Sequence, residues 1–126
     1  MTHVRAESST LRNHRGDLAI LLKQLRQRER LTQEDLAQIM RERAMTISRW
    51  ERQSATPRRE AAAKVRRLGE LEREARGVLA PAEFKEFLCA PHRLLMGLAP
   101  MDLLDNDRTF QRVLDLVRGM QASDAV

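Results

Sequence analysis

The chain is poor in the residues that build sheets and tight turns. Its 126 residues include no Tyr, one Trp and three Phe, and only five Gly and four Pro. Aromatic and β-branched side chains are typical of strands, whereas the Ala, Leu, Arg, Glu and Gln that dominate this chain favour helices. No segment alternates apolar and polar residues over the length of a strand. We therefore expect an all-α protein.

Cysteine and long apolar runs are also scarce. The single cysteine, Cys89, excludes a disulfide within the chain and fits a reducing compartment. The longest apolar run, residues 18–22, is far shorter than the roughly 20 residues that span a bilayer. Residues 1–15 are polar and charged, unlike a signal peptide. These features predict a cytoplasmic protein without a membrane partner.

The side chains that carry most enzyme chemistry are few and scattered. His3, His14 and His92 lie in three separate segments, and Cys89 lies on an apolar helix face. No His or Cys spacing suggests zinc, and no glycine-rich loop suggests a bound phosphate. The sequence predicts neither an enzyme, nor a metal site, nor a cofactor.

Charge divides the chain into two unequal halves. Residues 1–70 carry 16 Lys and Arg against 9 Asp and Glu, whereas residues 71–126 carry 7 against 9. A basic half can bind an anionic polymer, or it can simply be a solvated surface, and charge alone leaves both interpretations open.

The first half begins with a segment that has no apolar periodicity, residues 1–15, which predicts a flexible arm. A helix follows, with Asp17 placed to cap it. Its apolar stripe recurs at helical spacing: Leu18, Leu21, Leu22 and Leu25.

Two short helices come next, predicted over residues 33–40 and 44–53 and separated by about three residues. Thr32 is a good N-cap, and Asp35 is placed for a capping box. The second helix would bury Ile47 and Trp50 and present a basic outer face. Two such helices with a tight turn are typical of a helix-turn-helix, whose second helix enters the major groove of DNA.

These residues resemble the Xre family of phage-repressor-like (Cro/cI) helix-turn-helix proteins. The agreement lies in the leading Leu-Thr-Gln of LTQEDLAQIM, the Leu-Ala pair, Ile-Ser-Arg-Trp-Glu and the later Pro, and it covers roughly residues 17–68. The family commonly has a small residue, an apolar residue and a Ser or Thr where this chain has Arg41, Glu42 and Arg43. A turn that needs a positive φ is strained without Gly.

The resemblance implies a set of DNA contacts. Arg49 would contact guanine, and Ala44 and Met45 are limited to thymine methyl groups. Phosphates would be contacted by Arg41, Arg43, Arg52, Arg58 and Arg59. The resemblance also implies DNA contacts from Gln33 and Thr46. The alternative is a helix-turn-helix that serves only packing or dimerisation.

A fourth helix is predicted from residue 58 to 68. The pattern leaves open whether it ends near Gly69 or continues, and we treat residues 69–80 as a connecting helix. Pro81 then suits the start of a helix. Residues 90–107 have an irregular apolar pattern that predicts tight turns with one or two helical turns, and Asp107 is placed to cap a last helix.

Residues 84–126 resemble the toxin-binding domain of the MbcA/ParS/Xre antitoxin family. The matching residues are Phe87-Leu88, Pro91-His92-Arg93-Leu94-Leu95, Pro100-Met101-Asp102-Leu103-Leu104 and the last helix from Phe110 to Val117. His92 replaces the usual Asn, and Ser123 stands where a Gly is common. The order of an Xre-like helix-turn-helix before this module is more specific than either half.

The second resemblance implies a type II antitoxin. The family's partners are RES-domain toxins, which consume NAD. Such an antitoxin would cover the toxin's active-site entrance and repress the operon that encodes both proteins. We expect Leu94, Leu95, Leu103 and Leu104 to be mostly core. The implied toxin contacts are Arg93, Met96, Asp102 and Arg112, taken as exposed, with Gln121 and Asp124 in the tail.

The prediction is therefore an N-terminal arm (1–15), a helix-turn-helix domain (16–68), a connecting helix (69–80) and a toxin-binding domain (81–126), acting as a homodimer or in a larger complex with the toxin. Two alternatives remain. One is a stand-alone Xre-type repressor whose C-terminal region dimerises, and the other is a protein-binding module without DNA binding.

Overall fold

The computed structural model describes the backbone of residues 2–124 and the side chains of residues 16–122. Over that part the chain is helical, with one isolated β-bridge and no strand, which confirms the all-α prediction. None of the described helices is long and apolar enough to cross a membrane. The elements are α1 (Thr2–Glu29), α2 (Gln33–Met40), α3 (Ala44–Glu51), α4 (Arg59–Ala75), α5 (Pro81–Cys89), the 3-10 helices η1 (Arg93–Leu95) and η2 (Pro100–Leu103), and α6 (Asp107–Asp124).

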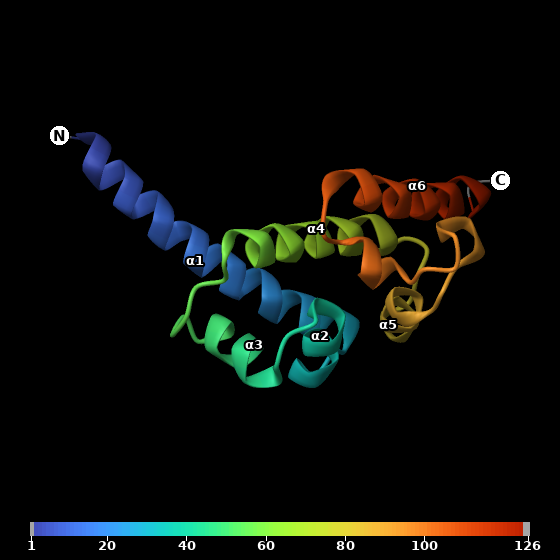
Figure 1. Cartoon of the computed structure of the whole chain (residues 1–126), viewed down its shortest axis with the longest axis horizontal. Helices are drawn as coiled ribbons and strands as arrows, with labels where there is room; N and C mark the ends of the chain where they lie inside the picture. Colours follow the sequence, from blue (N-terminus) through green and yellow to red (C-terminus); the bar gives the residue numbers. More distant parts are fainter. Residues whose placement is uncertain (1, 125–126) are drawn as a thin grey trace.

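Helix α4 joins the two halves of the molecule. It packs against α1 in the N-terminal half and against α6 in the C-terminal half (Figure 1). Gly69 lies where α4 crosses α1, and a Cβ atom there would come within 3.0 Å of Leu21 Cδ1. The helix continues through Gly69 to Ala75, which resolves the question that the sequence pattern left open. The glycine is therefore explained by close helix packing and not by a helix end.

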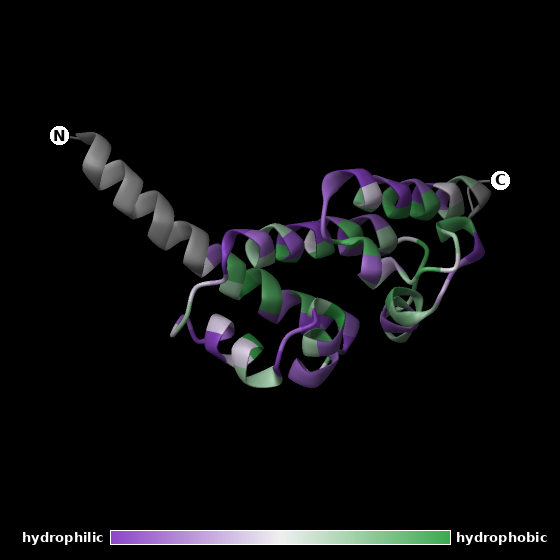
Figure 2. Cartoon of the chain, viewed as in Figure 1, coloured by the Kyte–Doolittle hydropathy of each residue, from purple (hydrophilic) through white to green (hydrophobic). Residues whose placement is uncertain are grey.

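One apolar core extends through both halves (Figure 2). Most of its side chains have less than a tenth of their surface exposed, and they come from every α-helix. Its largest fully buried members include Leu22, Leu25, Leu36, Ile39, Ile47, Leu68, Leu71, Phe84, Leu88 and Leu104. Because a chain half this long would bury a marginal core alone, the shared core makes the two halves one folding unit.

Local capping explains where several helices begin. The Thr32 hydroxyl accepts a hydrogen bond from the Asp35 amide (2.9 Å), and the Asp35 carboxylate accepts one from the Thr32 amide (3.0 Å), which confirms the predicted capping box. At the end of α2, Arg41 adopts a left-handed conformation with a φ of 57°. The turn therefore has the positive φ that a glycine would favour, at a cost of about 1–2 kcal/mol for a residue with a side chain.

Two predicted caps are wrong. Helix α1 already begins at Thr2, so the exposed Asp17 lies inside it and does not start it. The last helix is capped by Asn106, whose side-chain oxygen accepts a hydrogen bond from the Thr109 amide (3.0 Å). Asp107, the predicted cap, is instead the first residue of α6 and pairs with Arg67 of α4 at 3.1 Å.

A pair of buried carboxyl groups joins the end of α1 to α4. Glu29 and Glu72 are only 6% and 1% exposed. Burial, together with the hydrogen bond and the repulsion between the two carboxyl groups, raises the pKa of Glu29 to about 7. Burial also disfavours a charged Glu72, but hydrogen bonds from Arg76 (2.8 Å) and Glu29 outweigh it and lower the pKa of Glu72. The pair therefore holds one proton on Glu29 below neutral pH.

We predict that the free energy of unfolding falls as pH rises from about 4.5 to about 7, because folded Glu29 keeps a proton that the unfolded chain has lost. Glu29→Gln keeps a neutral side chain of the same shape. It should be more stable than the unchanged chain by about 1–3 kcal/mol at pH 8, with a smaller difference at pH 5. Urea unfolding at both pH values measures this.

The matched control for that measurement is Glu86→Gln, which alters an exposed carboxyl group on α5. It should leave the pH dependence unchanged. A Glu29→Gln effect of equal size at pH 5 and pH 8 would contradict the shared-proton explanation.

Candidate functional site

Helix α3 presents a polar face to solvent. Ile47 and Trp50 are buried, as predicted, whereas Arg43, Met45 and Arg49 are exposed, Met45 with 61% of its surface. A major groove about 12 Å wide admits one helix, and the exposed side chains of α3 are those that would reach base edges. The predicted contacts Ala44 and Thr46 are half-buried and lie closer to the body of the protein.

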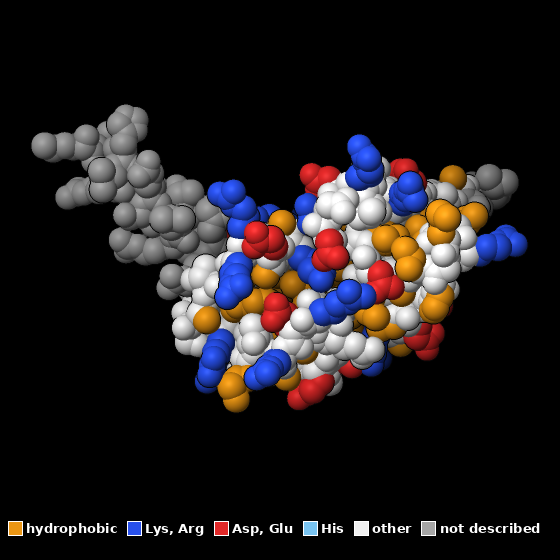
Figure 3. All heavy atoms as spheres, in the orientation of Figure 1, with side chains coloured by type: hydrophobic (Ala, Val, Ile, Leu, Met, Phe, Trp, Pro, Cys, Tyr) orange, Lys and Arg blue, Asp and Glu red, His pale blue; other side chains and the backbone are white. Residues whose placement is uncertain are grey.

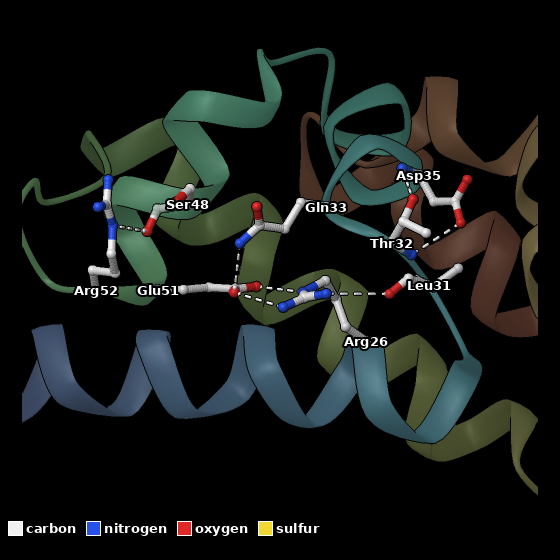
Figure 4. A network of polar contacts seen from close by, with 8 residues as sticks. All are labelled: Arg26, Leu31, Thr32, Gln33, Asp35, Ser48, Glu51 and Arg52. Carbon is white, nitrogen blue, oxygen red and sulfur yellow. Dashed lines mark hydrogen bonds and ion pairs between the residues drawn. The ribbon is translucent and has the colours of Figure 1, made fainter.

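A polar network holds α3 in place. Glu51, at the end of α3, accepts two hydrogen bonds from Arg26 of α1, at 2.6 Å from Nε and 2.8 Å from Nη2 (Figure 4). Gln33 of α2 donates a third from its side-chain amide, at 3.1 Å. The hydrogen bond to Glu51 raises the pKa of Arg26, which stays charged. Three helices are therefore fixed by one buried carboxylate.

This network was missed by the sequence analysis. Glu51 is the last residue of the Ile-Ser-Arg-Trp-Glu segment, and a charged residue beside a buried Trp was the available signal. Gln33 was predicted to contact DNA, and its amide is half-buried and bound to Glu51. It still lies at the first residue of α2, beside backbone amides that suit a phosphate group.

The arginines predicted to contact phosphate differ in whether their side chains are already bonded within the protein. Arg43, Arg58 and Arg59 are exposed, and Arg52 bonds weakly to the Ser48 carbonyl at 3.4 Å. Arg41 forms an ion pair with Asp102, the third residue of η2. A residue predicted to contact DNA is therefore bound to a residue predicted to contact a protein partner.

The predicted partner contacts also divide into two groups. Arg93, Met96 and Arg112 are exposed. Asp102 is half-buried rather than exposed, because its carboxylate binds Arg41 and also accepts a hydrogen bond from the Ala99 amide at 3.1 Å. The second bond caps the start of η2.

The tail residues lie against α4 or beyond the described side chains. The Gln121 side-chain amide donates a hydrogen bond to the Glu74 carbonyl at 2.5 Å, so this predicted contact packs on the protein itself. The side chain of Asp124 lies outside the described residues.

One predicted core residue is exposed. Leu95, Leu103 and Leu104 are buried as expected, but Leu94 has 67% of its surface exposed. Its neighbours Met96 and Leu98 are 80% and 45% exposed. A 3-10 turn places successive side chains on different sides, so Leu95 is buried here while Leu94 is exposed to solvent.

The remaining side chains to consider are those that could hold a metal ion or act as a nucleophile. Over the described residues no cluster of His, Cys, Asp or Glu is arranged to hold a metal ion. Burial raises the pKa of the half-buried Cys89 thiol, which disfavours the reactive thiolate. His92 accepts a hydrogen bond from the Leu94 amide through Nδ1, at 3.1 Å.

The Arg26–Glu51 ion pair gives a testable prediction about stability. Glu51→Ala should lower the free energy of unfolding by about 2–4 kcal/mol, because it leaves Arg26 largely buried without its partner. Arg26→Ala should cost a similar amount, and the double variant should cost clearly less than the two single changes added together. Urea unfolding of the three variants measures the coupling. Strictly additive effects would show that the pair is not a unit.

Comparisons with known proteins identify the N-terminal part. Residues 22–69 match the family model of the helix-turn-helix, HTH_3. No curated protein matches the chain. A crystal structure of the M. tuberculosis MbcT-MbcA toxin-antitoxin complex matches with a TM-score of 0.70 and 26% identity, over 84% of this chain and 95% of the matched chain. The chain therefore contains an Xre-type helix-turn-helix DNA-binding domain, and over most of its length it is similar in structure to the MbcA antitoxin.

Proposed function

We propose that the chain is a type II antitoxin, which neutralises a RES-domain, NAD-consuming toxin by covering its active site and represses its own operon. The observation that carries this proposal is the structural similarity to an antitoxin over 84% of the chain, which includes both halves. A similarity confined to the helix-turn-helix would support a repressor alone. Both activities belong to the cytoplasm, where operator DNA and a newly made toxin are found together.

DNA binding is attributed to the outer face of α3. Arg49 donates two hydrogen bonds to a guanine edge, and the exposed Met45 contacts a thymine methyl group beside it. Arg43, Arg52 and Arg58 bind phosphates, which makes the affinity depend on salt. Because readers of this kind bind paired half-sites, the active form is at least a dimer.

Toxin binding is attributed to the C-terminal module. Arg93, Met96 and Arg112 are exposed and available to a partner. Asp102 and Gln121, the other described residues of this set, already bond to Arg41 of the N-terminal half and to Glu74 of α4, respectively. A specific interface of about 800 Å² per partner would use a sizeable part of so small a protein.

Two other functions are distinguishable from this one. A stand-alone Xre-type repressor would bind its operator but no protein encoded beside it. A protein-binding module would bind such a protein but not DNA. The exposed arginines of α3 favour DNA binding over the second alternative.

The base contact of Arg49 can be tested with Arg49→Ala. The variant should lose about 1–3 kcal/mol of preference for the operator over unrelated DNA, because the guanine contact is specific. Electrophoretic mobility shifts on the operator and on scrambled DNA measure the ratio. Arg58→Ala serves as the matched control, since loss of a phosphate contact should weaken both DNAs alike. An equal loss on both DNAs for Arg49→Ala would contradict a base contact.

The role of the tail can be tested by ending the chain after Gly119. The shortened protein should neutralise the toxin less well in a growth assay, because the tail residues that we propose to contact the toxin are missing, and should still bind the operator. Gln121→Ala is the control for lost packing on α4, because it removes the bonds from Gln121 to the Glu74 carbonyl and carboxylate and leaves the rest of the tail in place. Full neutralisation by the shortened chain would refute a role of the tail in toxin binding.

A further inference from the structure

Residues 92–98 form a closed loop that displays apolar side chains. Among the described residues, five large hydrophobic side chains are markedly exposed, and three of them are in this loop: Leu94, Met96 and Leu98. Isolated exposed hydrophobic residues are common on soluble proteins, but a cluster at one place usually marks an interaction site.

Backbone hydrogen bonds close the loop. The His92 amide donates to the Leu98 carbonyl (3.0 Å), and the Gly97 amide donates to the His92 carbonyl (3.0 Å). Met96 and Gly97 both have a positive φ, at 59° and 82°, which reverses the chain direction at the tip. The loop conformation is therefore set before any partner binds, and binding loses little conformational entropy in ordering it.

One side chain fixes the loop to the core. Leu95 is 3% exposed and belongs to the apolar core, whereas its neighbours Leu94 and Met96 are 67% and 80% exposed. The same short turn therefore buries one apolar side chain and holds two others out in solvent. The exposure of Leu94 and Met96 is not the result of a loosely packed loop, because backbone hydrogen bonds close the loop and Leu95 fixes it to the core.

The composition of the loop selects the kind of partner. Its only cation is Arg93, and its exposed groups are otherwise apolar, so it is unsuited to a phosphate backbone, which needs several cations. In Figure 3, hydrophobic side chains gather over the C-terminal half, away from the side that carries α3. A protein with an apolar pocket and a nearby carboxylate for Arg93 fits this surface best.

We propose that Met96, flanked by Leu94 and Leu98, is the apolar anchor that this chain inserts into a pocket of its toxin. The inference rests on the proposed function and adds to it a contact that is separate from the C-terminal tail. Methionine suits this role because its flexible, polarisable side chain adapts to an apolar pocket.

The test is Met96→Asp in the full chain, with Ile20→Asp as the matched control. Ile20 is 54% exposed on α1, so the control places the same charge on an exposed apolar residue outside the loop. The probe is the purified RES-domain protein encoded beside the chain, inactivated in its own active site, and isothermal titration calorimetry gives the dissociation constant. Met96→Asp should weaken binding by about 30-fold or more, as expected for an anchor residue, while Ile20→Asp and Met96→Leu bind as the unchanged chain does.

Each other outcome has a definite meaning. Unchanged binding by Met96→Asp, while the unchanged chain binds the probe, overturns the anchor and leaves the proposed function intact. Absence of binding by the unchanged chain overturns the proposed function and the anchor with it. If Met96→Asp instead converts a dimer into a monomer in sedimentation, the loop joins two copies of the chain, and the proposal is wrong.

Discussion

The bidentate ion pair between Arg26 and Glu51 is the contact on which the DNA-binding half depends. It joins α1 to the end of α3, and the bond from Gln33 adds the start of α2. A buried carboxylate is unfavourable unless its oxygens are occupied, and here three donors occupy them. The apolar core holds the helices together, but apolar contacts tolerate small rotations. The directional bonds to Glu51 fix the angle at which α3 presents Arg49.

A second set of ion pairs fixes the two halves relative to each other. Arg41 pairs with Asp102, Lys64 with Asp105 at 3.2 Å, and Lys85 with Asp35 at 2.6 Å. Each pair is partly exposed to solvent, and such pairs contribute little individually. Their value lies in position, because they surround a core that both halves already share. The C-terminal module is therefore held at a defined place relative to α2, α3 and α4.

The parts of the fold that could be predicted from sequence are those set by near neighbours. The capping box joins Thr32 to Asp35, and Ile47 and Trp50 share one helix face, so short spacing decides both. The Arg41–Asp102 pair joins residues 61 positions apart, and no local pattern indicates it. Asn106 rather than Asp107 caps α6 because tertiary pairing draws Asp107 to Arg67. Leu94 was expected in the core beside Leu95, but the 3-10 turn of residues 93–95 buries Leu95 and exposes Leu94.

Residues 102–107, which lead into α6, neutralise part of the positive charge of the N-terminal half. Asp102, Asp105 and Asp107 each pair with a cation of the N-terminal half, namely Arg41, Lys64 and Arg67. Part of the positive charge counted in the sequence is thus used within the molecule. Among the described residues, the arginines at both ends of α3 and at the start of α4 are exposed (Arg43, Arg49, Arg52, Arg58 and Arg59), and so are other cations of this half, such as Lys23 and Arg30. Folding therefore pairs three cations of the basic half with aspartates, while the arginines beside and on α3 stay exposed and can orient a polyanion.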